Sequence, residues 1–243
     1  MQQMEKLFLS GVEKLKKWLK PDKPLSTPTK ICKICFKEIK NGAYHDFLNN
    51  GIICYSCLNQ LNPSFIEFKI DDVECLAIYE YSDFVKEKIY QYKGCGDFEL
   101  ANVFIGPFAL ELKTLFRDFE IVLVPSHKEE NHVSYMFNCL GLNMHDIFYK
   151  IENHKQSDQN YHKRHEVGKF IKFKEGKADL AGKKILLVDD VCTTGSTLKA
   201  CIKKIKDLNP LNLKVLVIAK RVFSDEELNE LTKKEGSKNI EIV

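Results

Sequence analysis

The feature that most constrains the fold lies between residues 185 and 207, where an apolar run meets an acidic pair and then a hydroxyl-rich turn. Residues 185–188 read ILLV, four consecutive apolar side chains, which is typical of a strand buried on both faces of a sheet. Asp189 and Asp190 end the run, and apolar positions at helical spacing resume from Leu198. A buried strand that leads through a short loop into a helix predicts an α/β fold.

The same alternation extends over most of the chain. We expect further strands at 75–81, 120–125, 146–151 and 214–219, and helices at 83–92, 98–116 and 196–207. Strands that alternate with helices predict a mostly parallel sheet covered by helices on both faces.

The turn after the acidic pair has the composition of an anion site. Residues 193–197 read TTGST and open the expected helix, whose first amide groups have no partner inside the helix and favour a negative charge. We expect Gly195 to allow close approach of a ligand or to take an unusual backbone dihedral. The two carboxylates can accept hydrogen bonds from vicinal sugar hydroxyls, so the unit predicts a site for ribose 5-phosphate. The alternative is a buried strand whose acidic end only caps a turn.

Residues 185–197 resemble the signature of type I phosphoribosyltransferases, which bind phosphoribosyl pyrophosphate (PRPP). The resemblance implies that Asp189 and Asp190 are catalytic and contact the ribose. It assigns PRPP binding to the following residues: Val191, Cys192, Thr193, Thr194, Gly195, Ser196 and Thr197. It further implies Mg²⁺ bound with the diphosphate. A second anion site, for pyrophosphate, is expected after the earlier strand, at Ser126, His127 and Lys128.

The cysteines divide into one cluster and scattered members. Cys32 and Cys35 form one CxxC pair and Cys54 and Cys57 a second, at the spacing of a four-cysteine structural zinc site. A segment this short cannot bury enough apolar surface to fold alone, so a metal is a physical need. The alternative, a redox motif, does not usually come doubled on a short segment. We expect the other cysteines to be mostly small core residues. Cys192 lies inside the phosphate loop and need not be a nucleophile.

Bulk composition selects no partner. The net charge is +3, and nine cysteines form an odd set in a chain long enough to build its own core. With no apolar run of spanning length and no signal peptide, we expect a cytoplasmic protein without a transmembrane segment. We divide it into a basic amphipathic helix and linker at 1–29, a zinc knuckle at 30–62, and an α/β domain at 70–243. The helix could lie on a membrane, dock on a partner or pack on its own domain.

Residues 126–168 are expected to include a mobile loop over the site, because periodicity is lost after Ile151. This stretch contains most of the histidines of the chain, and we interpret them as solvated loop residues rather than metal ligands. They are His127, His132, His145, His154, His162 and His165.

A four-cysteine knuckle joined to the phosphoribosyltransferase signature resembles the ComF family of bacteria, which is associated with competence for DNA uptake. The resemblance covers about residues 32–221 and includes residues 79–93, Gln156 and Arg164. It implies a type I phosphoribosyltransferase-like sheet with helices on both faces, plus the N-terminal zinc knuckle. The chain departs from the family where an arginine-rich segment should follow Pro125, although Phe137 and Asn138 match. The missing arginine concerns turnover more than binding, and Lys93, Lys128 or Arg164 could replace its charge.

These observations leave three functions open. The first is a Mg²⁺-dependent phosphoribosyltransferase with an unidentified acceptor. The second is a non-catalytic PRPP-sensing adaptor that binds single-stranded DNA or a DNA-uptake helicase through the zinc module, and an oligomer is possible in either case. Lysines around the knuckle could then contact phosphates, unless they form only a solvated basic face: Lys14, Lys16, Lys17, Lys20, Lys30, Lys33, Lys37 and Lys40. The third, a transcription regulator of the purine-repressor kind, ranks last because no helix-turn-helix is evident.

Overall fold

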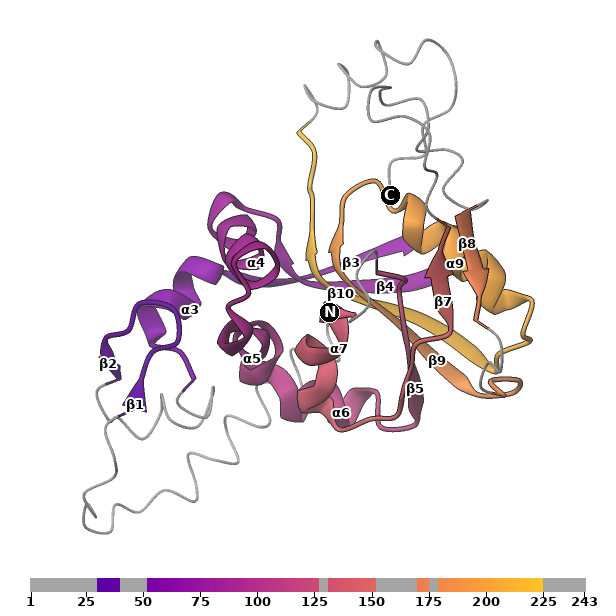
Figure 1. Cartoon of the computed structure of the whole chain (residues 1–243), viewed down its shortest axis with the longest axis horizontal. Coiled ribbons are helices and arrows are strands. Elements are labelled where there is room, and N and C mark those ends of the chain that lie inside the picture. The colour runs from indigo at the N-terminus through magenta and orange to yellow at the C-terminus, as the bar shows by residue number, and fades with distance from the viewer. Residues whose placement is uncertain (1–29, 40–51, 127–130, 152–169, 175–178, 225–243) are drawn as a thin grey trace.

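The computed structural model describes residues 30–39, 52–126, 131–151, 170–174 and 179–224 (Figure 1). The expected N-terminal helix and linker, residues 1–29, lie outside the described residues.

The centre of the fold is a six-stranded sheet of order β3-β4-β10-β9-β5-β6. Its strands are β3 (Pro63–Ile70), β4 (Val73–Glu80), β5 (Phe119–Leu123), β6 (Met144–His145), β9 (Lys184–Cys192) and β10 (Asn212–Lys220). Strand β3 runs antiparallel to β4, and every other neighbouring pair is parallel. The prediction of a mostly parallel sheet is confirmed, and the carboxyl ends of β4, β5, β9 and β10 therefore meet at one edge.

Both faces of the sheet are covered, as expected, because alternate residues of the central strands enter two separate cores. Leu186 and Val188 of β9 pack with the helices α4 to α7, whereas Ile185 and Leu187 pack with α9 (Ser196–Lys206). On the first face lie α4 (Asp83–Cys95), η1 (Phe98–Leu100), α5 (Ala101–Ile105), η2 (Gly106–Phe108), α6 (Ala109–Leu115), α7 (His132–Phe137) and η3 (Asn138–Leu140). In Figure 1 the two sets of helices flank the sheet from opposite sides.

Three elements differ from the expectations. The helix expected at 98–116 is divided at Gly106 and Pro107, because proline lacks the amide proton that a continuous helix needs. The strand expected at 146–151 is shorter, β7 (Phe148–Lys150), and pairs with β8 (Ile171–Phe173) in a separate two-stranded sheet. The α/β domain was expected to begin at residue 70, and no strand was expected before it. Strand β3 begins earlier, at Pro63.

The cysteine-rich segment packs against this domain. Its described elements are β1 (Lys30–Ile31), β2 (Glu38–Ile39) and α3 (Tyr55–Leu61), which lie beside α4 and α5 (Figure 1). Ile52 approaches Gly106 so closely that a Cβ at that glycine would lie 2.6 Å from Ile52 Cδ1. Lys33 Nζ also lies 2.5 Å from Glu99 Oε2 of η1. Within the described residues, no helix combines the length and the apolar character that a membrane span requires.

Candidate functional site

The acidic pair lies at the carboxyl end of β9, at the edge where the parallel strands end. The Asp190 amide donates to Asp189 Oδ1 at 2.9 Å, and the Val191 amide donates to Asp190 Oδ1 at 2.6 Å. Because successive side chains of a strand point to opposite faces, the two carboxylates face different surroundings.

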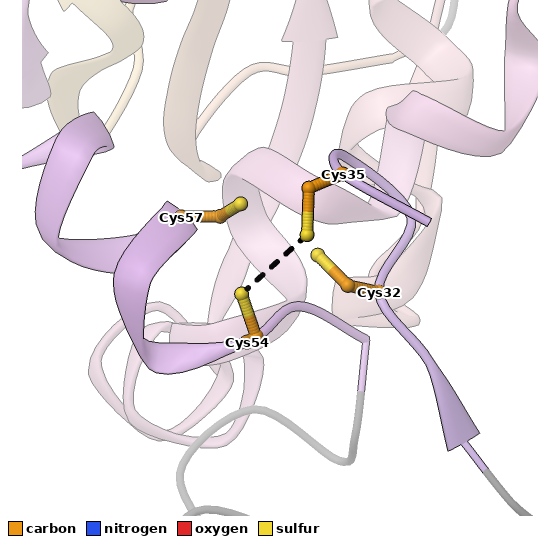
Figure 2. Close-up of side chains that lie close together, drawn as sticks. All are labelled: Cys32, Cys35, Cys54 and Cys57. Atoms are coloured by element: carbon orange, nitrogen blue, oxygen red, sulfur yellow. Dashed lines mark hydrogen bonds between the residues drawn. The ribbon is translucent and has the colours of Figure 1, made fainter. Parts of the chain in front are cut away.

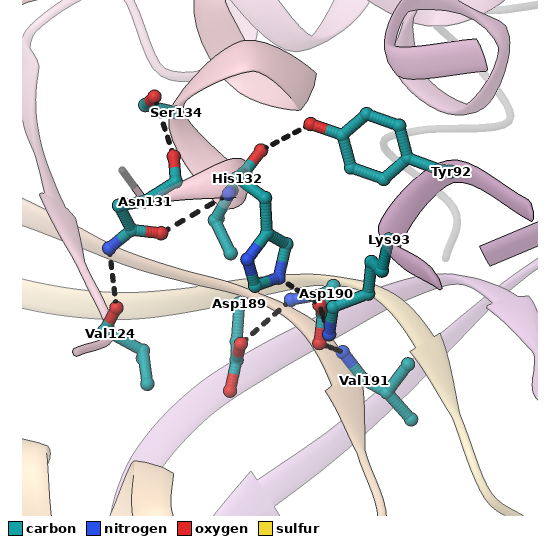
Figure 3. A network of polar contacts seen from close by, with 10 residues as sticks. Tyr92, Lys93, Val124, Asn131, His132, Ser134, Asp189, Asp190 and Val191 are labelled. Atoms are coloured by element: carbon teal, nitrogen blue, oxygen red, sulfur yellow. Dashed lines mark hydrogen bonds and ion pairs between the residues drawn. The ribbon is translucent and has the colours of Figure 1, made fainter. Parts of the chain in front are cut away.

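Asp190 is 5% exposed and lies between two basic groups (Figure 3). Lys93, from the last turn of α4, forms an ion pair with Asp190 Oδ2, and His132 Nε2 lies 2.7 Å from the same oxygen. Burial opposes the negative charge of Asp190, but the hydrogen bond with His132 and the charge of Lys93 outweigh it, so the pKa of Asp190 is lowered. Asp190 is therefore a fixed anion.

Asp189 has the opposite character. Burial, and then the negative charge of Asp190, raise the pKa of Asp189 to about 8. In the described part of the chain, no ion pair neutralises the Asp189 carboxylate, although the more distant charges of Lys93 and Lys150 lower its pKa slightly. Asp189 is thus the carboxyl group whose charge a bound cation or sugar would stabilise most.

The first turn of α7 is fixed by a set of hydrogen bonds that position His132 (Figure 3). Asn131 caps the helix by accepting from the Val133 amide at 3.2 Å, and its Nδ2 donates to the Val124 carbonyl oxygen at 2.8 Å. Tyr92 donates its hydroxyl to the His132 carbonyl oxygen at 2.6 Å. These bonds join α7 to the end of β5 and to α4, so the contact between His132 and Asp190 depends on three elements.

Two cavities adjoin the acidic pair. The larger, of about 400 Å³, is bordered by Asp190, Lys93, His132 and Lys150 together with the end of β5. The smaller, of about 50 Å³, is bordered by residues 191–198. Asp189 and Thr197 belong to both walls. A ligand with a small anionic end and a larger body could therefore occupy both cavities across Asp189.

The wall of the smaller cavity has the geometry of an anion cradle. Gly195 has φ 72°, the unusual dihedral that the sequence predicted, and its carbonyl oxygen accepts from the Lys199 amide at 2.8 Å to begin α9. Thr194 Oγ1 and Ser196 Oγ lie 2.9 Å apart. Among the described hydrogen bonds, none is donated by the amides of Thr193, Thr194 or Ser196. These amides can point at a phosphate.

The four clustered cysteines fit a tetrahedral metal site (Figure 2). The Sγ atoms of Cys32, Cys35, Cys54 and Cys57 all lie within 4.8 Å of one another, and those of Cys35 and Cys54 are 3.8 Å apart. Zinc–sulfur bonds of about 2.3 Å in a tetrahedron place sulfur atoms about 3.8 Å apart. Burial raises the pKa of the Cys32 thiol, but backbone hydrogen bonds from Cys35, Cys54 and Ile34 outweigh it and lower that pKa to about 7. All nine cysteines are free of disulfides.

Comparison with known proteins agrees with this arrangement. Residues 144–242 match the phosphoribosyl transferase domain. Competence protein ComFC of Bacillus subtilis is 31% identical over 130 residues, which cover 50% of this chain and 53% of that protein. Competence protein ComFC of Streptococcus pneumoniae is 27% identical over 150 residues, which cover 59% of this chain and 67% of that protein. The chain thus spans about half the length of the first relative. The four-cysteine cluster lies outside the matched domain, at residues 32–57.

These findings support the resemblance of the chain to the ComF family. Its fold is of the type I phosphoribosyltransferase kind, a mostly parallel six-stranded sheet with helices and an N-terminal four-cysteine cluster. Among solved structures, a hypoxanthine phosphoribosyltransferase from Staphylococcus aureus overlaps 54% of this chain and 66% of its own at 13% identity, with a TM-score of 0.36. One from Trypanosoma cruzi overlaps 52% and 71% at 14% identity, with a TM-score of 0.38.

Several residues singled out in the sequence lie at the two cavities. Asp189, Asp190, Ser126 and Lys93 border the larger one, and the loop from Val191 to Thr197 borders the smaller one. Cys192 is buried, and burial raises the pKa of its thiol to about 11, so it is a poor nucleophile. His127, Lys128, Gln156 and Arg164 lie outside the described residues.

The interpretation of the histidines as solvated loop residues was wrong for His132 and His145. His132 contacts Asp190, and His145 Nε2 lies 3.0 Å from Glu120 Oε2. His154, His162 and His165 fall outside the described residues. No sequence pattern identified Tyr92, Asn131 or Lys150 as part of the site, because only the tertiary fold brings them there.

Proposed function

We propose that this protein binds PRPP together with Mg²⁺ and transfers its phosphoribosyl group to an acceptor. The observation that carries the proposal is the position of Asp189, which stands between a small cavity lined by amides and hydroxyls and a larger cavity with basic residues. PRPP has a ribose between a 5-phosphate and a 1-diphosphate. Its three parts therefore match the order of the smaller cavity, Asp189 and the larger cavity. We assign the 5-phosphate to the loop of residues 193–197, and the ribose hydroxyls to the carboxylates of Asp189 and Asp190.

The reaction would break the bond between C1 of the ribose and the diphosphate oxygen, and form a bond between C1 and a nucleophilic atom of the acceptor, which loses a proton. Positive charge develops on the sugar as the diphosphate leaves with the bonding electrons. The fixed anion Asp190 supplies a preorganised negative charge at the site. Mg²⁺ would neutralise the diphosphate, and Asp189 is the residue suited to face it, since its carboxylate has no ion-pair partner among the described residues.

Calorimetry with PRPP and Mg²⁺, followed by an assay for pyrophosphate release across a panel of acceptors, tests the proposal. We expect binding, and we expect Asp189→Asn to weaken it by about tenfold or more, because an amide cannot carry the charge that attracts Mg²⁺ and hydroxyl protons. Asp207→Asn is the matched control, since Asp207 is exposed at the opposite end of α9. Absence of PRPP binding would exclude both this function and the one that follows.

The second candidate is a PRPP-sensing adaptor without turnover. It is favoured by the contacts of Lys93 and His132, which are both committed to Asp190 rather than available to a leaving diphosphate. Two relatives are named competence proteins, so the adaptor would act in DNA uptake in the cytoplasm. Its zinc module would bind single-stranded DNA or a helicase. Binding of PRPP that persists without pyrophosphate release by any acceptor would favour this candidate.

A further inference from the structure

Among the described residues that border the larger cavity, one lysine forms no ion pair, although its charge does lower the pKa of Asp189. Among the basic residues that border it, Lys93 and His132 both contact Asp190 Oδ2, whereas Lys150 borders the cavity from β7. Within the described part of the chain, no hydrogen bond or ion pair holds the Lys150 ammonium group. A partly buried ammonium with no partner among the described residues is available to a ligand anion.

Lys150 is also held in place by its backbone. Strand β7 pairs with β8, Phe148 stacks on Phe173 with ring centroids 5.1 Å apart, and the Ile151 amide donates to the Phe170 carbonyl oxygen at 2.8 Å. These contacts fix the strand on both sides of Lys150. The backbone from which the Lys150 side chain extends is therefore fixed before a ligand arrives, which reduces the entropy lost on binding.

We propose that Lys150 binds the diphosphate of PRPP and so distinguishes PRPP from ribose 5-phosphate. This inference rests on the proposed function, which assigns the 5-phosphate to the loop of residues 193–197 and the ribose to Asp189. Because Asp189 forms the wall shared by the two cavities, the group on C1 extends into the larger cavity. There Lys150 is the described lysine whose charge is not already balanced by Asp190, and phosphate oxygens can accept charge-assisted hydrogen bonds from its ammonium group.

The experiment compares three ligands on four proteins in the presence of Mg²⁺. Calorimetry measures PRPP, ribose 5-phosphate and pyrophosphate on the unmodified chain, Lys150→Gln, Lys150→Arg and Lys172→Gln. Lys172 is the matched control, because it is exposed on β8 opposite Tyr149 and does not border the cavity. Thermal unfolding of each variant shows whether the β7–β8 pair is intact.

We expect Lys150→Gln to weaken PRPP and pyrophosphate binding by about tenfold or more, which is the effect of losing one charge-assisted hydrogen bond, and to change ribose 5-phosphate affinity by less than about twofold. Lys150→Arg should retain most of the PRPP affinity, and Lys172→Gln should behave as the unmodified chain. Equal losses for PRPP and ribose 5-phosphate, or no loss for either, would overturn the role of Lys150 while leaving the proposed function standing. If the unmodified chain binds neither sugar phosphate, both proposals fail.

Discussion

Asp189 and Asp190 are adjacent in the chain, yet the fold gives their carboxyl groups opposite tendencies to ionise. Lys93 and His132 hold Asp190 as an anion, and that anion, together with burial, opposes ionisation of Asp189. Neighbouring groups whose pKa values are shifted in opposite directions are common at functional sites. A bound ligand can stabilise a charge that is unfavourable in the free protein. The destabilisation of the ligand-free protein by Asp189 is measurable as a dependence of the free energy of unfolding on pH.

Substitution of Asp189 by asparagine should stabilise the free protein at neutral pH. The carboxyl ionises near 3.8 when unfolded and near 8 when folded, so between these values the native state retains a proton that the unfolded state has lost. Stability contributed by Asp189 therefore falls as pH rises through this window, and asparagine removes the loss. We expect calorimetry without PRPP to show a Tm for Asp189→Asn that is higher by about 2–4 °C or more at pH 7.5, with a smaller difference at pH 5.5.

The same measurement on Asp207→Asn, an exposed site far along α9, should show no such pH-dependent difference. A Tm for Asp189→Asn that is unchanged or lower at pH 7.5 would contradict the raised pKa. Together with weaker PRPP binding, a gain in Tm would show that this residue serves the ligand at the expense of the fold.

For single residues, the sequence predicted the features that depend on local chemistry. The left-handed backbone of Gly195 follows from its place in a tight loop before a helix. The contacts of Asp190 with Lys93 and His132 could not be predicted, because they join α4, α7 and β9 through tertiary packing. No short-range pattern reports such a contact.

Helix α7 is short, and its position depends on its capping residue more than on its length. Asn131 is 8% exposed and makes two different bonds: its side-chain oxygen caps the helix, and its side-chain amide donates to the Val124 carbonyl oxygen. The second bond joins α7 to the end of β5 at the wall of the larger cavity. Asn131 thereby determines where His132 lies relative to Asp190.

Two substitutions separate these bonds. Asn131→Ala removes both, and we expect it to lower the free energy of unfolding by about 1–3 kcal/mol, since the Val124 carbonyl oxygen and the Val133 amide lose their partner. Asn131→Asp keeps the capping oxygen and loses the donor to Val124. If the bond to β5 positions the site, Asn131→Asp should weaken PRPP binding as much as Asn131→Ala does. Urea unfolding and calorimetry measure the two effects, and Ser134→Ala is the control on the same turn. Full PRPP affinity in Asn131→Asp would refute this role.

The elements were predictable where one periodic pattern decided them. Strands β9 and β10 are long apolar runs buried on both faces, so their identity needed no tertiary information. Strand β3 was missed because it is an edge strand with mixed burial, it begins with a proline, and its register shifts between Pro63 and Ile66. Strand β6 has two residues, Met144 and His145, which is too few for any periodicity. Pairing with a neighbour, rather than local sequence, defines both.

On the scale of the whole molecule, the cysteine knuckle and the sheet domain share a core. Cys32, Cys57 and Leu61 belong to the same buried cluster as Tyr92 and Phe104 of the helices that cover the sheet. The knuckle therefore does not resemble a separate module on a linker. Burial of apolar surface between the two parts links their stabilities, because loss of one exposes the core of the other.

This shared core predicts how the protein unfolds when a metal held by the four cysteines is removed. The cluster could hold zinc, and a knuckle of this size would depend on that metal to fold, so a zinc-selective chelator should destabilise the whole chain. Scanning calorimetry should show one cooperative transition that moves to lower temperature, and added zinc should restore it. Cys54→Ser should behave as the chelated protein, whereas Cys95→Ser should not, since Cys95 is exposed and outside the cluster. Two separate transitions, with the larger one unmoved by chelation, would show instead that the knuckle folds on its own and that the packing of Ile52 on Gly106 transmits little.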